Sequence, residues 1–201
     1  MNKKTKILAV GDIHGDTGLV KKLADKAKKE NVDLVILAGD LTFAEDSTKN
    51  LIGPFLKAKK QVLLIPGNHE TFATTEFLAQ SYPNTQNIHG YSFTKNDLGI
   101  FGAGGAIGFN MSEKEIFDTL NKAHKGVENS KKTIMVTHMH HKGSEAEFSG
   151  FEGSKAIKKA IKEFHPDLLI SAHIHEAGGI EEKIGKTKII NVSRNPKIFE
   201  I

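Results

Sequence analysis

The chain has 201 residues and no cysteine, which excludes a disulfide framework, a thiol nucleophile, an iron–sulfur cluster and a thiolate zinc site. A chain of this length can bury about 70% of its unfolded surface, and we expect a single domain over residues 1–201. The net charge is +4, yet Arg194 is the only arginine. Arginine is the usual bidentate reader of phosphate and guanine, so this composition argues against sequence-specific recognition of nucleic acids.

The N-terminal segment does not have the pattern of a targeting signal. Its apolar run, residues 7–10, is too short for the core of a signal peptide. The longest run of low polarity, residues 100–109, is rich in glycine and far shorter than a membrane span. We therefore predict a cytoplasmic protein with no membrane partner.

The first third of the chain alternates short apolar runs with a helical pattern. The run "ILAV" at 7–10 is followed by apolar residues at helical spacing over 19–27, with lysines on the other face. The run "VDLVILA" at 32–38 comes next, and "QVLLI" at 61–65 is a third buried strand. A strand, an amphipathic helix and a strand in succession predict a parallel pair.

The remainder of the chain continues this alternation. Asn96-Asp97 between two short apolar runs predicts a hairpin, and Ser112 with Glu115 predicts a capping box at the start of a helix. The expected elements are a helix over 112–124, a strand over 132–138, a helix over 154–164, a strand over 167–173, and a hairpin that pairs 180–184 with 187–192.

Residues of the types that commonly bind metal ions follow the ends of five predicted strands. In open α/β sheets, ligands bind outside the carboxyl ends of the strands, so we expect these side chains to converge on one rim. The five segments are Gly11-Asp12-Ile13-His14-Gly15, Gly39-Asp40, Asn68-His69-Glu70, Thr137-His138 and His173-Ile174-His175.

The spacing and the chemistry of these residues predict a metal centre. Asp12 and His14 are separated by one residue, and in extended backbone such residues point the same way; the same holds for His173 and His175. Imidazole and carboxylate without thiolate suit manganese, iron, cobalt, nickel or zinc. Seven candidate ligands exceed the need of one ion. Two ions about 3.5–4 Å apart that share a carboxylate would use them all, clamp a phosphate and lower the pKa of a bridging water.

The five segments, taken in order over residues 11–175, resemble the motifs of the calcineurin-like metallophosphoesterase family. The resemblance implies an α/β fold in which a two-sheet β-sandwich is flanked by helices on both outer faces. It also implies a ligand set: Asp12, His14 and His175 for the first metal, Asn68, His138 and His173 for the second, and Asp40 as the bridge between them.

The resemblance further implies how the reaction proceeds. A bridging hydroxide would attack phosphorus in line, while His69 would contact the phosphate and protonate the leaving alkoxide. Asn68 would bind metal through its carbonyl oxygen and donate from its amide to a phosphate oxygen. The predicted catalytic residues are thus His69, Asp40 and Asn68.

Together these expectations predict a dinuclear-metal phosphoesterase that hydrolyses small phosphodiesters or phosphomonoesters. Manganese is the first candidate for the two ions, with iron, zinc, nickel or cobalt as alternatives. Two other functions stay open: a non-catalytic interaction scaffold on the same fold, and a nuclease or cyclic-nucleotide phosphodiesterase. A short chain with few inserted elements predicts an open site, which favours diesters. The sequence does not indicate an oligomeric state.

The chain departs from the family's pattern at three places. His140-His141 stand where the family often has two prolines, and they are either further substrate or metal contacts or polar surface. Ala172 replaces a glycine, for which we expect little effect. The late segment matches the family only in Asn191 and Ser193, which leaves its part in the site open.

Other polar residues have simpler interpretations. We expect Asp16 to cap the helix that follows it. His89, His124 and His165 lie outside the motifs and are interpreted as structural or surface residues. Glu70 either orients a ligand histidine or belongs to the start of a helix.

Overall fold

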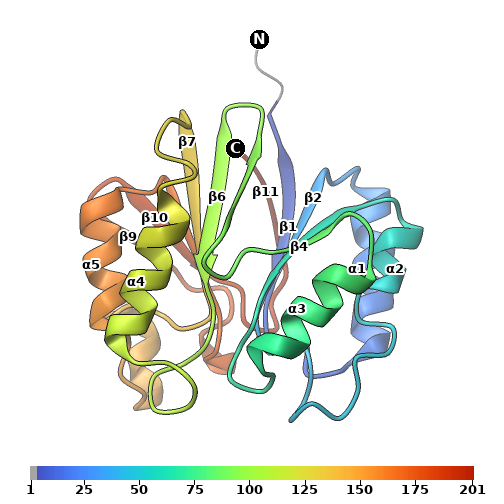
Figure 1. Cartoon of the computed structure of the whole chain (residues 1–201), viewed down its shortest axis with the longest axis horizontal. Helices are drawn as coiled ribbons and strands as arrows, with labels where there is room; N and C mark the ends of the chain where they lie inside the picture. The colour runs from blue at the N-terminus through green and yellow to red at the C-terminus, as the bar shows by residue number, and fades with distance from the viewer. Residues whose placement is uncertain (1–3) are drawn as a thin grey trace.

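Two β-sheets pack face to face, and helices cover their outer faces (Figure 1). The computed structural model describes residues 4–201, so residues 1–3 of the predicted domain lie outside the described part. The predicted fold class, a β-sandwich flanked by helices, is confirmed.

The first sheet has five strands in the order β11-β1-β2-β3-β4. Neighbours are parallel except for β11, which pairs antiparallel with β1. The strands are β1 (Lys6–Val10), β2 (Leu34–Ala38), β3 (Gln61–Ile65), β4 (Thr85–Asn87) and β11 (Lys197–Glu200). Three helices belong to this half of the molecule: α1 (Thr17–Lys29), α2 (Gly53–Lys57) and α3 (Phe72–Ser81).

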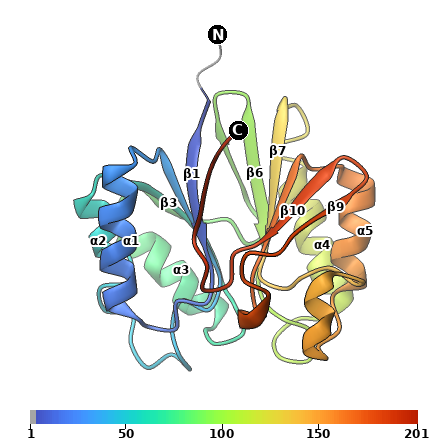
Figure 2. The same cartoon turned by 180° about the vertical axis from the view of Figure 1, so that it is seen from behind.

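The second sheet has six strands in the order β5-β6-β7-β8-β10-β9. The strands are β5 (Ser92–Lys95), β6 (Leu98–Ala103), β7 (Lys132–Thr137), β8 (Leu168–Ser171), β9 (Glu181–Ile184) and β10 (Thr187–Asn191). Two long helices and two 3₁₀ turns complete this half: α4 (Glu113–His124), α5 (Lys155–Phe164), η1 (Glu145–Ser149) and η2 (His175–Ala177). Figure 2 shows β1 beside the C-terminal segment, where the two halves of the chain meet.

Most predicted elements are confirmed. Ser112 forms the predicted capping box with Glu115, and β5 and β6 form the predicted hairpin. Asp16 caps α1 by accepting a hydrogen bond from the backbone N–H of Leu19. The sequence did not reveal β4 or β11, because β4 is three polar residues and β11 follows a proline. It gave no bounds for α3 or for α2, a five-residue helix that opens on Gly-Pro.

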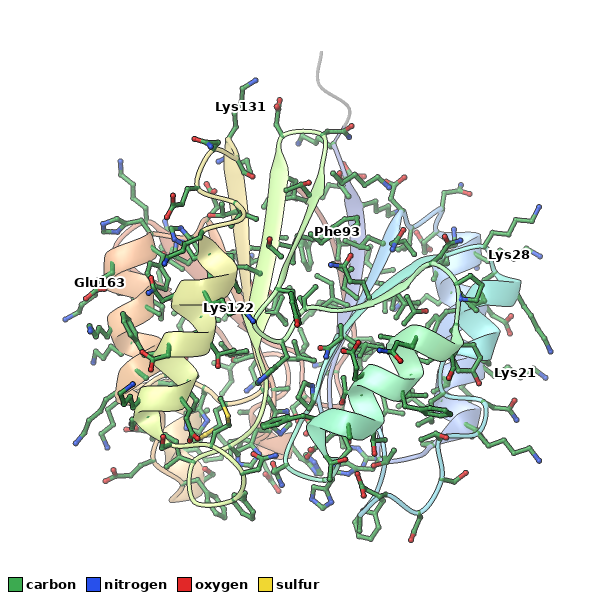
Figure 3. All side chains as sticks on the ribbon, viewed as in Figure 1. Lys21, Lys28, Phe93, Lys122, Lys131 and Glu163 are labelled. Carbon is green, nitrogen blue, oxygen red and sulfur yellow. The ribbon has the colours of Figure 1, made fainter. Side chains whose placement is uncertain are left out.

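Three apolar layers hold the sandwich together. In β2 every residue is buried, because alternate side chains face the opposite sheet and the helices. Ile36 belongs to the layer between the sheets, and Leu37 to the layer under α1 and α2. A third layer, which includes Phe101, lies between the second sheet and α4 and α5. Charged side chains such as Lys21, Lys131 and Glu163 point outward (Figure 3).

This topology sends the carboxyl ends of parallel strands from both sheets to one edge. Strands β1, β2 and β3 are mutually parallel in one sheet, and β7 and β8 are parallel in the other. In Figure 1, β1 and β7 both begin at the upper edge and run downward. The loops that follow these strands therefore share the lower edge of the molecule.

Within residues 4–201, no helix combines the length and the apolar character that crossing a bilayer requires.

His89 is a structural residue, as predicted from the sequence. Its Nδ1 accepts a hydrogen bond of 3.0 Å from the backbone N–H of Gly104, and its ring stacks on Phe72 with centroids 4.6 Å apart. Burial, assisted by the positive charge of Lys122, lowers the pKa of His89 to about 4. The neutral ring is thus the form that the fold accommodates.

We predict that His89 makes the fold less stable in acid. Between the ordinary histidine pKa of 6.5 and about 4, the unfolded chain binds a proton that folded His89 does not. The free energy of unfolding should therefore fall from pH 7 to pH 5 by a larger amount in the wild type than in a His89→Gln variant. Urea titrations at both pH values measure this difference, and an equal fall in the two proteins would contradict it.

Candidate metal centre

The predicted ligands all lie on loops that follow strands of the two sheets. Asp12 and His14 follow β1, Asp40 follows β2, and Asn68 with His69 follows β3. From the second sheet, His138 follows β7, and His173 and His175 follow β8. The structure brings the aspartates and histidines among these residues together in sets whose ligand atoms lie within 4.8 Å of one another, and His69 shares such a set with His14 and Asp40.

The first group consists of Asp12, His14 and His175. The Nε2 atoms of the two histidines are 3.1 Å apart. Asp12 Oδ1 lies 3.9 Å from His14 Nε2 and 3.8 Å from His175 Nε2. Two imidazole nitrogens and one carboxylate oxygen thus surround one point.

The second group is centred on Nε2 of His138, which is fully buried. This atom lies 3.0 Å from Asn68 Oδ1, 3.2 Å from His173 Nδ1 and 3.4 Å from Asp40 Oδ2. The amide oxygen, the two imidazole nitrogens and the carboxylate oxygen therefore converge on a second point.

Asp40 lies between the two groups. Its Oδ2 is 3.7 Å from His14 Nε2 in the first group and 3.4 Å from His138 Nε2 in the second. Its Oδ1 accepts hydrogen bonds from the backbone N–H groups of Asn68, at 2.8 Å, and His69, at 3.0 Å. One oxygen of Asp40 thus fixes a loop, and the other faces both groups.

The two carboxylate oxygens of Asp12 also have different surroundings. Its Oδ2 accepts hydrogen bonds from the backbone N–H of His173, at 3.0 Å, and from the hydroxyl of Ser193. Its Oδ1 is buried and has no hydrogen-bond partner within residues 4–201. A buried carboxylate oxygen without a partner is costly, and a cation beside it would remove that cost. The donor set therefore fits a metal ion.

Hydrogen bonding and charge set the state of the histidines. His138 Nδ1 donates to the carbonyl of Ala38 at 2.9 Å, which directs Nε2 toward the second group. Burial alone would lower the pKa of His138, but the charge and hydrogen bond of Asp40 outweigh it and raise the pKa to about 9. Burial and the charge of His138 lower the pKa of His173 to about 3. A cation bound between them would displace the proton of His138.

Four of the candidate ligands have left-handed backbone. The φ angles are 57° at Asp12, 48° at His14, 50° at Asp40 and 74° at His173. Such conformations cost about 1–3 kcal/mol each and persist where the surrounding structure imposes them. The extended-backbone reason for pairing Asp12 with His14 and His173 with His175 was therefore wrong: a tight turn brings Asp12 and His14 to one group, and His173 and His175 belong to different groups.

A family model described as calcineurin-like phosphoesterase matches residues 5–177. The chain belongs to the calcineurin-like phosphoesterase family. The match covers most of the chain and all five motifs on which the resemblance rests. No curated protein matches the chain in sequence.

Solved structures share the fold of this chain. The protein TT1561 of Thermus thermophilus is 17% identical, with a TM-score of 0.77 over 95% of this chain and 90% of that one. An archaeal phosphodiesterase is 18% identical, with a TM-score of 0.58 over 98% and 99%. A dimetal phosphatase from Danio rerio is 9% identical, with a TM-score of 0.62 over 94% and 87%. At these identities the likeness establishes the fold alone.

Glu70 lies at the start of α3, one residue before its N-cap Thr71, and its carboxylate has a role that the sequence did not suggest. The buried carboxylate accepts hydrogen bonds from the backbone N–H of Gly67, at 2.7 Å, and of Thr42, at 3.1 Å. Within residues 4–201 it makes no hydrogen bond to a candidate ligand histidine, and Thr71 provides the side-chain cap of α3. Glu70 ties the loop after β3 to the loop after β2, and so holds Asn68 beside Asp40.

The structure also answers two questions that the sequence left open: the place of His140-His141 and the part that the late segment plays in the site. His140 and His141 are buried, so their interpretation as polar surface was wrong. His140 Nε2 donates to the carbonyl of Phe151 at 3.2 Å and fixes that loop, and neither histidine belongs to a group of potential metal ligands among the described residues. Ser193 supports the site through Asp12, and Asn191 Oδ1 accepts from the Ser193 N–H at 2.9 Å. The partial motif match was the only sequence signal for these two.

A hollow of about 600 Å³ opens over the two ligand groups. His69 lies in its wall, where the ring of Phe43 stacks on it with centroids 5.3 Å apart. Asp40, Asn68 and Arg194 also line the hollow. A ligand that enters it meets the predicted metal ligands and the predicted acid together.

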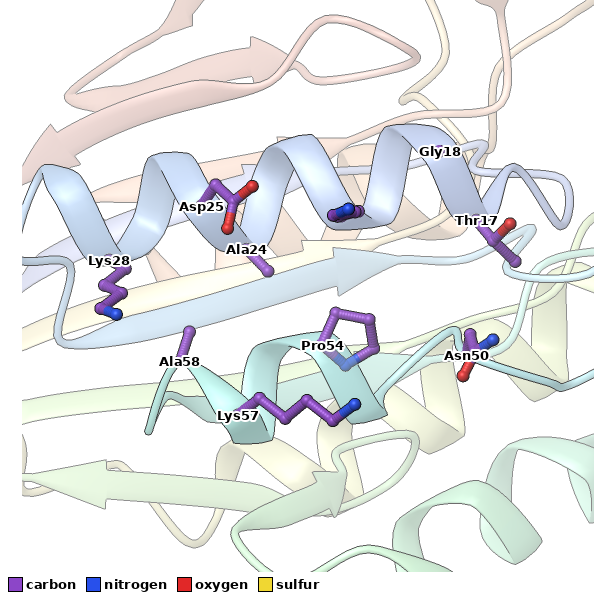
Figure 4. A pocket seen from close by; sticks show the side chains of 10 residues that line it. Thr17, Gly18, Ala24, Asp25, Lys28, Asn50, Pro54, Lys57 and Ala58 are labelled. Atoms are coloured by element: carbon purple, nitrogen blue, oxygen red, sulfur yellow. The ribbon is translucent and has the colours of Figure 1, made fainter.

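A second groove, of about 510 Å³, lies between α1 and α2 on the outside of the first sheet (Figure 4). Lys28 and Lys57 lie along it, with Asp25 as its carboxylate. It contains no histidine, and we assign no chemistry to it.

We predict that Gly67→Ala weakens metal binding. A Cβ at residue 67 would overlap Asp40 Oδ1, so the carboxylate would have to move away from the two groups. Gly53→Ala is the matched control, because a Cβ there meets nothing within 4 Å. Metal analysis after dialysis should find less metal in Gly67→Ala than in the wild type or the control. Equal metal content in all three proteins would contradict the role of Asp40.

Proposed function

We propose that the protein is a phosphoesterase that uses two divalent transition-metal ions to hydrolyse phosphodiesters, and phosphomonoesters as a second class. The observation that best supports this proposal is the position of Asp40 Oδ2, 3.7 Å from His14 Nε2 and 3.4 Å from His138 Nε2. A carboxylate oxygen shared between two ligand groups is the arrangement that a two-metal site uses.

The ligand groups define which residues would hold the ions. Asp12, His14 and His175 would hold one, Asn68, His138 and His173 the other, and Asp40 would contact both. When bound, the ions would polarise the phosphate and supply a water of lowered pKa. The nitrogen and oxygen donors suit manganese, with iron, zinc, nickel or cobalt as alternatives.

The remaining tasks fall to the chain's own side chains. Asn68 directs Oδ1 toward His138 and keeps its amide N–H groups for a phosphate oxygen. His69 lies in the wall of the hollow next to His14, with ring centroids 4.7 Å apart. From there it would give a proton to the leaving alkoxide, as a positioned imidazole does in general acid catalysis.

The openness of the hollow supports diesters as the preferred class, because both groups esterified to the phosphate need room. Among the proteins of similar fold are an archaeal phosphodiesterase and a dimetal phosphatase, which is consistent with either ester class. We therefore keep monoesters as a second class of substrate.

We expect purified protein to contain up to two transition-metal ions per chain and to hydrolyse an activated aryl phosphodiester. A chelator should abolish the activity, and added manganese should restore it, because the ions supply the nucleophile and the charge stabilisation. Release of product from a panel of aryl monoesters, aryl diesters and cyclic nucleotides measures this activity. Metal-loaded protein that leaves the whole panel intact would refute the proposal.

We predict that His69→Asn keeps its metals but slows hydrolysis of esters with poor leaving groups by roughly 10²–10⁴-fold. The loss should be smaller for aryl leaving groups, which need less protonation. His165→Asn is the control, because His165 is an exposed residue at the end of α5. Values of kcat for alkyl and aryl esters of one series test the prediction. Equal losses on both would count against acid catalysis by His69.

A further inference from the structure

Four exposed phenylalanines surround the hollow over the metal centre. Seven large hydrophobic side chains of residues 4–201 are exposed, and four of these line this one hollow. They are Phe43 at 55% exposure, Phe109 at 64%, Phe148 at 63% and Phe151 at 58%. A concentration of exposed apolar surface at one place marks a binding site. We call these four residues the phenylalanine rim.

The rim has members beside both ligand groups. Phe43 packs against His69 and His14, with centroids 5.3 and 5.9 Å apart, so it adjoins the first group. Phe109 and Phe151 approach His173 edge-on, at 6.4 and 6.3 Å, so they adjoin the second group. A phosphate held between the two groups would therefore have aromatic rings beside each of its two ester arms.

Hydrogen bonds hold the loop that carries Phe148 and Phe151. Glu147 accepts from the backbone N–H groups of Gly143 and Gly153, each at 2.9 Å, and these bonds lower the pKa of Glu147 to about 2. His140 holds the carbonyl of Phe151. A loop that is already ordered loses little entropy when it binds a ligand.

The loop that carries Phe43 is held in a similar way. Glu45 accepts hydrogen bonds from the backbone N–H of Thr71, at 2.7 Å, and from the hydroxyl of Thr74, at 2.6 Å. These bonds fasten the loop to the start of α3. One face of Phe43 rests on His69, while more than half of the side chain stays exposed.

From this rim we propose that the substrate is a phosphodiester with a planar nucleobase on each side of the phosphate, as in a dinucleotide. This inference rests on the proposed function. Stacking on phenylalanine accepts any base, because every base has a π-face. Ser149, Glu176 and Arg194 also line the hollow and offer polar groups to the edges of a base. The volume of about 600 Å³ lies in the range of small-molecule sites.

The surroundings of the rim favour a nucleotide over a lipid bilayer. Phe43 and Phe109 line the same hollow as Asp40, His175 and Glu176. Insertion into a bilayer would remove these polar groups from water, which is costly. A dinucleotide fits them better, because it carries a phosphate for the metal centre and polar edges on its bases.

The test uses the metal-loaded protein and a dinucleotide of 2-aminopurine and thymine in which methylene groups replace both ester oxygens that join the phosphorus to the two sugars. This probe cannot be hydrolysed, and stacking quenches its fluorescence. The variants are Phe43→Leu and Phe109→Leu, one from each side of the rim, with Phe77→Leu as the matched control. Phe77 is 57% exposed and lies on α3. Metal content is measured in every variant.

We expect each rim variant to bind the probe about tenfold more weakly than the wild type, a difference of about 1.4 kcal/mol. The control should bind as the wild type does. Leucine keeps an apolar side chain but removes the π-face, so the comparison separates stacking from simple apolar contact. An abasic analogue of the probe should compete poorly.

Two results would overturn the inference. The first is equal binding of the probe by the wild type and both rim variants, or equal binding of the abasic analogue. The second is co-sedimentation with phosphatidylglycerol vesicles that the leucine variants retain, which would assign the rim to a bilayer. Binding of the probe does not depend on turnover. Failure of hydrolysis with intact probe binding would therefore refute the proposed function, and loss of stacking with intact hydrolysis would refute this inference.

Discussion

The site depends on the Asp40 carboxylate, whose two oxygens make different contacts. Oδ1 is held by the backbone N–H groups of Asn68 and His69, which fixes the loop after β3. Oδ2 is thereby directed to the position between the two histidine groups. Gly67 has no side chain because the Asp40 carboxylate occupies the space that a Cβ would need. A shift of this one carboxylate would disturb both ligand groups at once.

The order of the strands and the turns that follow them place the candidate ligands around Asp40. Parallel strands from two sheets end at one edge, and tight turns with left-handed residues redirect the chain there. The strain at Asp12, His14, Asp40 and His173 has to be offset by the three apolar layers of the sandwich. Stable strands on either side thus make possible the less favourable backbone that presents the ligands. Glu70 and Ser193 add hydrogen bonds that keep these turns in place.

Much of the fold could be predicted from the sequence, because its strands are continuous apolar runs and its long helices have clear periodicity and caps. The runs at β1, β2 and β3 and the capping box at Ser112 are such signals. Strands β4 and β11 could not be predicted, because their pairing comes from neighbouring strands and not from their own composition. The candidate ligands could be named because histidine is uncommon at turns. Which oxygen of Asp40 faces the histidines, and which carbonyl orients His138, depends on contacts between residues far apart in the chain.

The roles of Glu70, His140 and the exposed phenylalanines depend on three-dimensional contacts in the same way. Glu70 follows His69 directly in the sequence, yet its hydrogen bonds join two loops and do not reach a ligand histidine. His140 follows the motif histidine closely, yet it supports the loop of Phe151. The phenylalanine rim comes from loops that are far apart in the sequence and near one another only in the fold. The candidate metal ligands, the supporting carboxylates and the aromatic rings thus lie together at the edge where the strands end.

The central claim is that two ions share Asp40, and electron paramagnetic resonance of the manganese-loaded protein tests it most directly. Protein loaded with two equivalents of manganese should give the spectrum of a spin-coupled pair, because one carboxylate oxygen would join the ions. Asp40→Asn should lose the coupled signal. A spectrum of isolated manganese ions in the wild type, or binding that saturates at one ion per chain, would contradict the account.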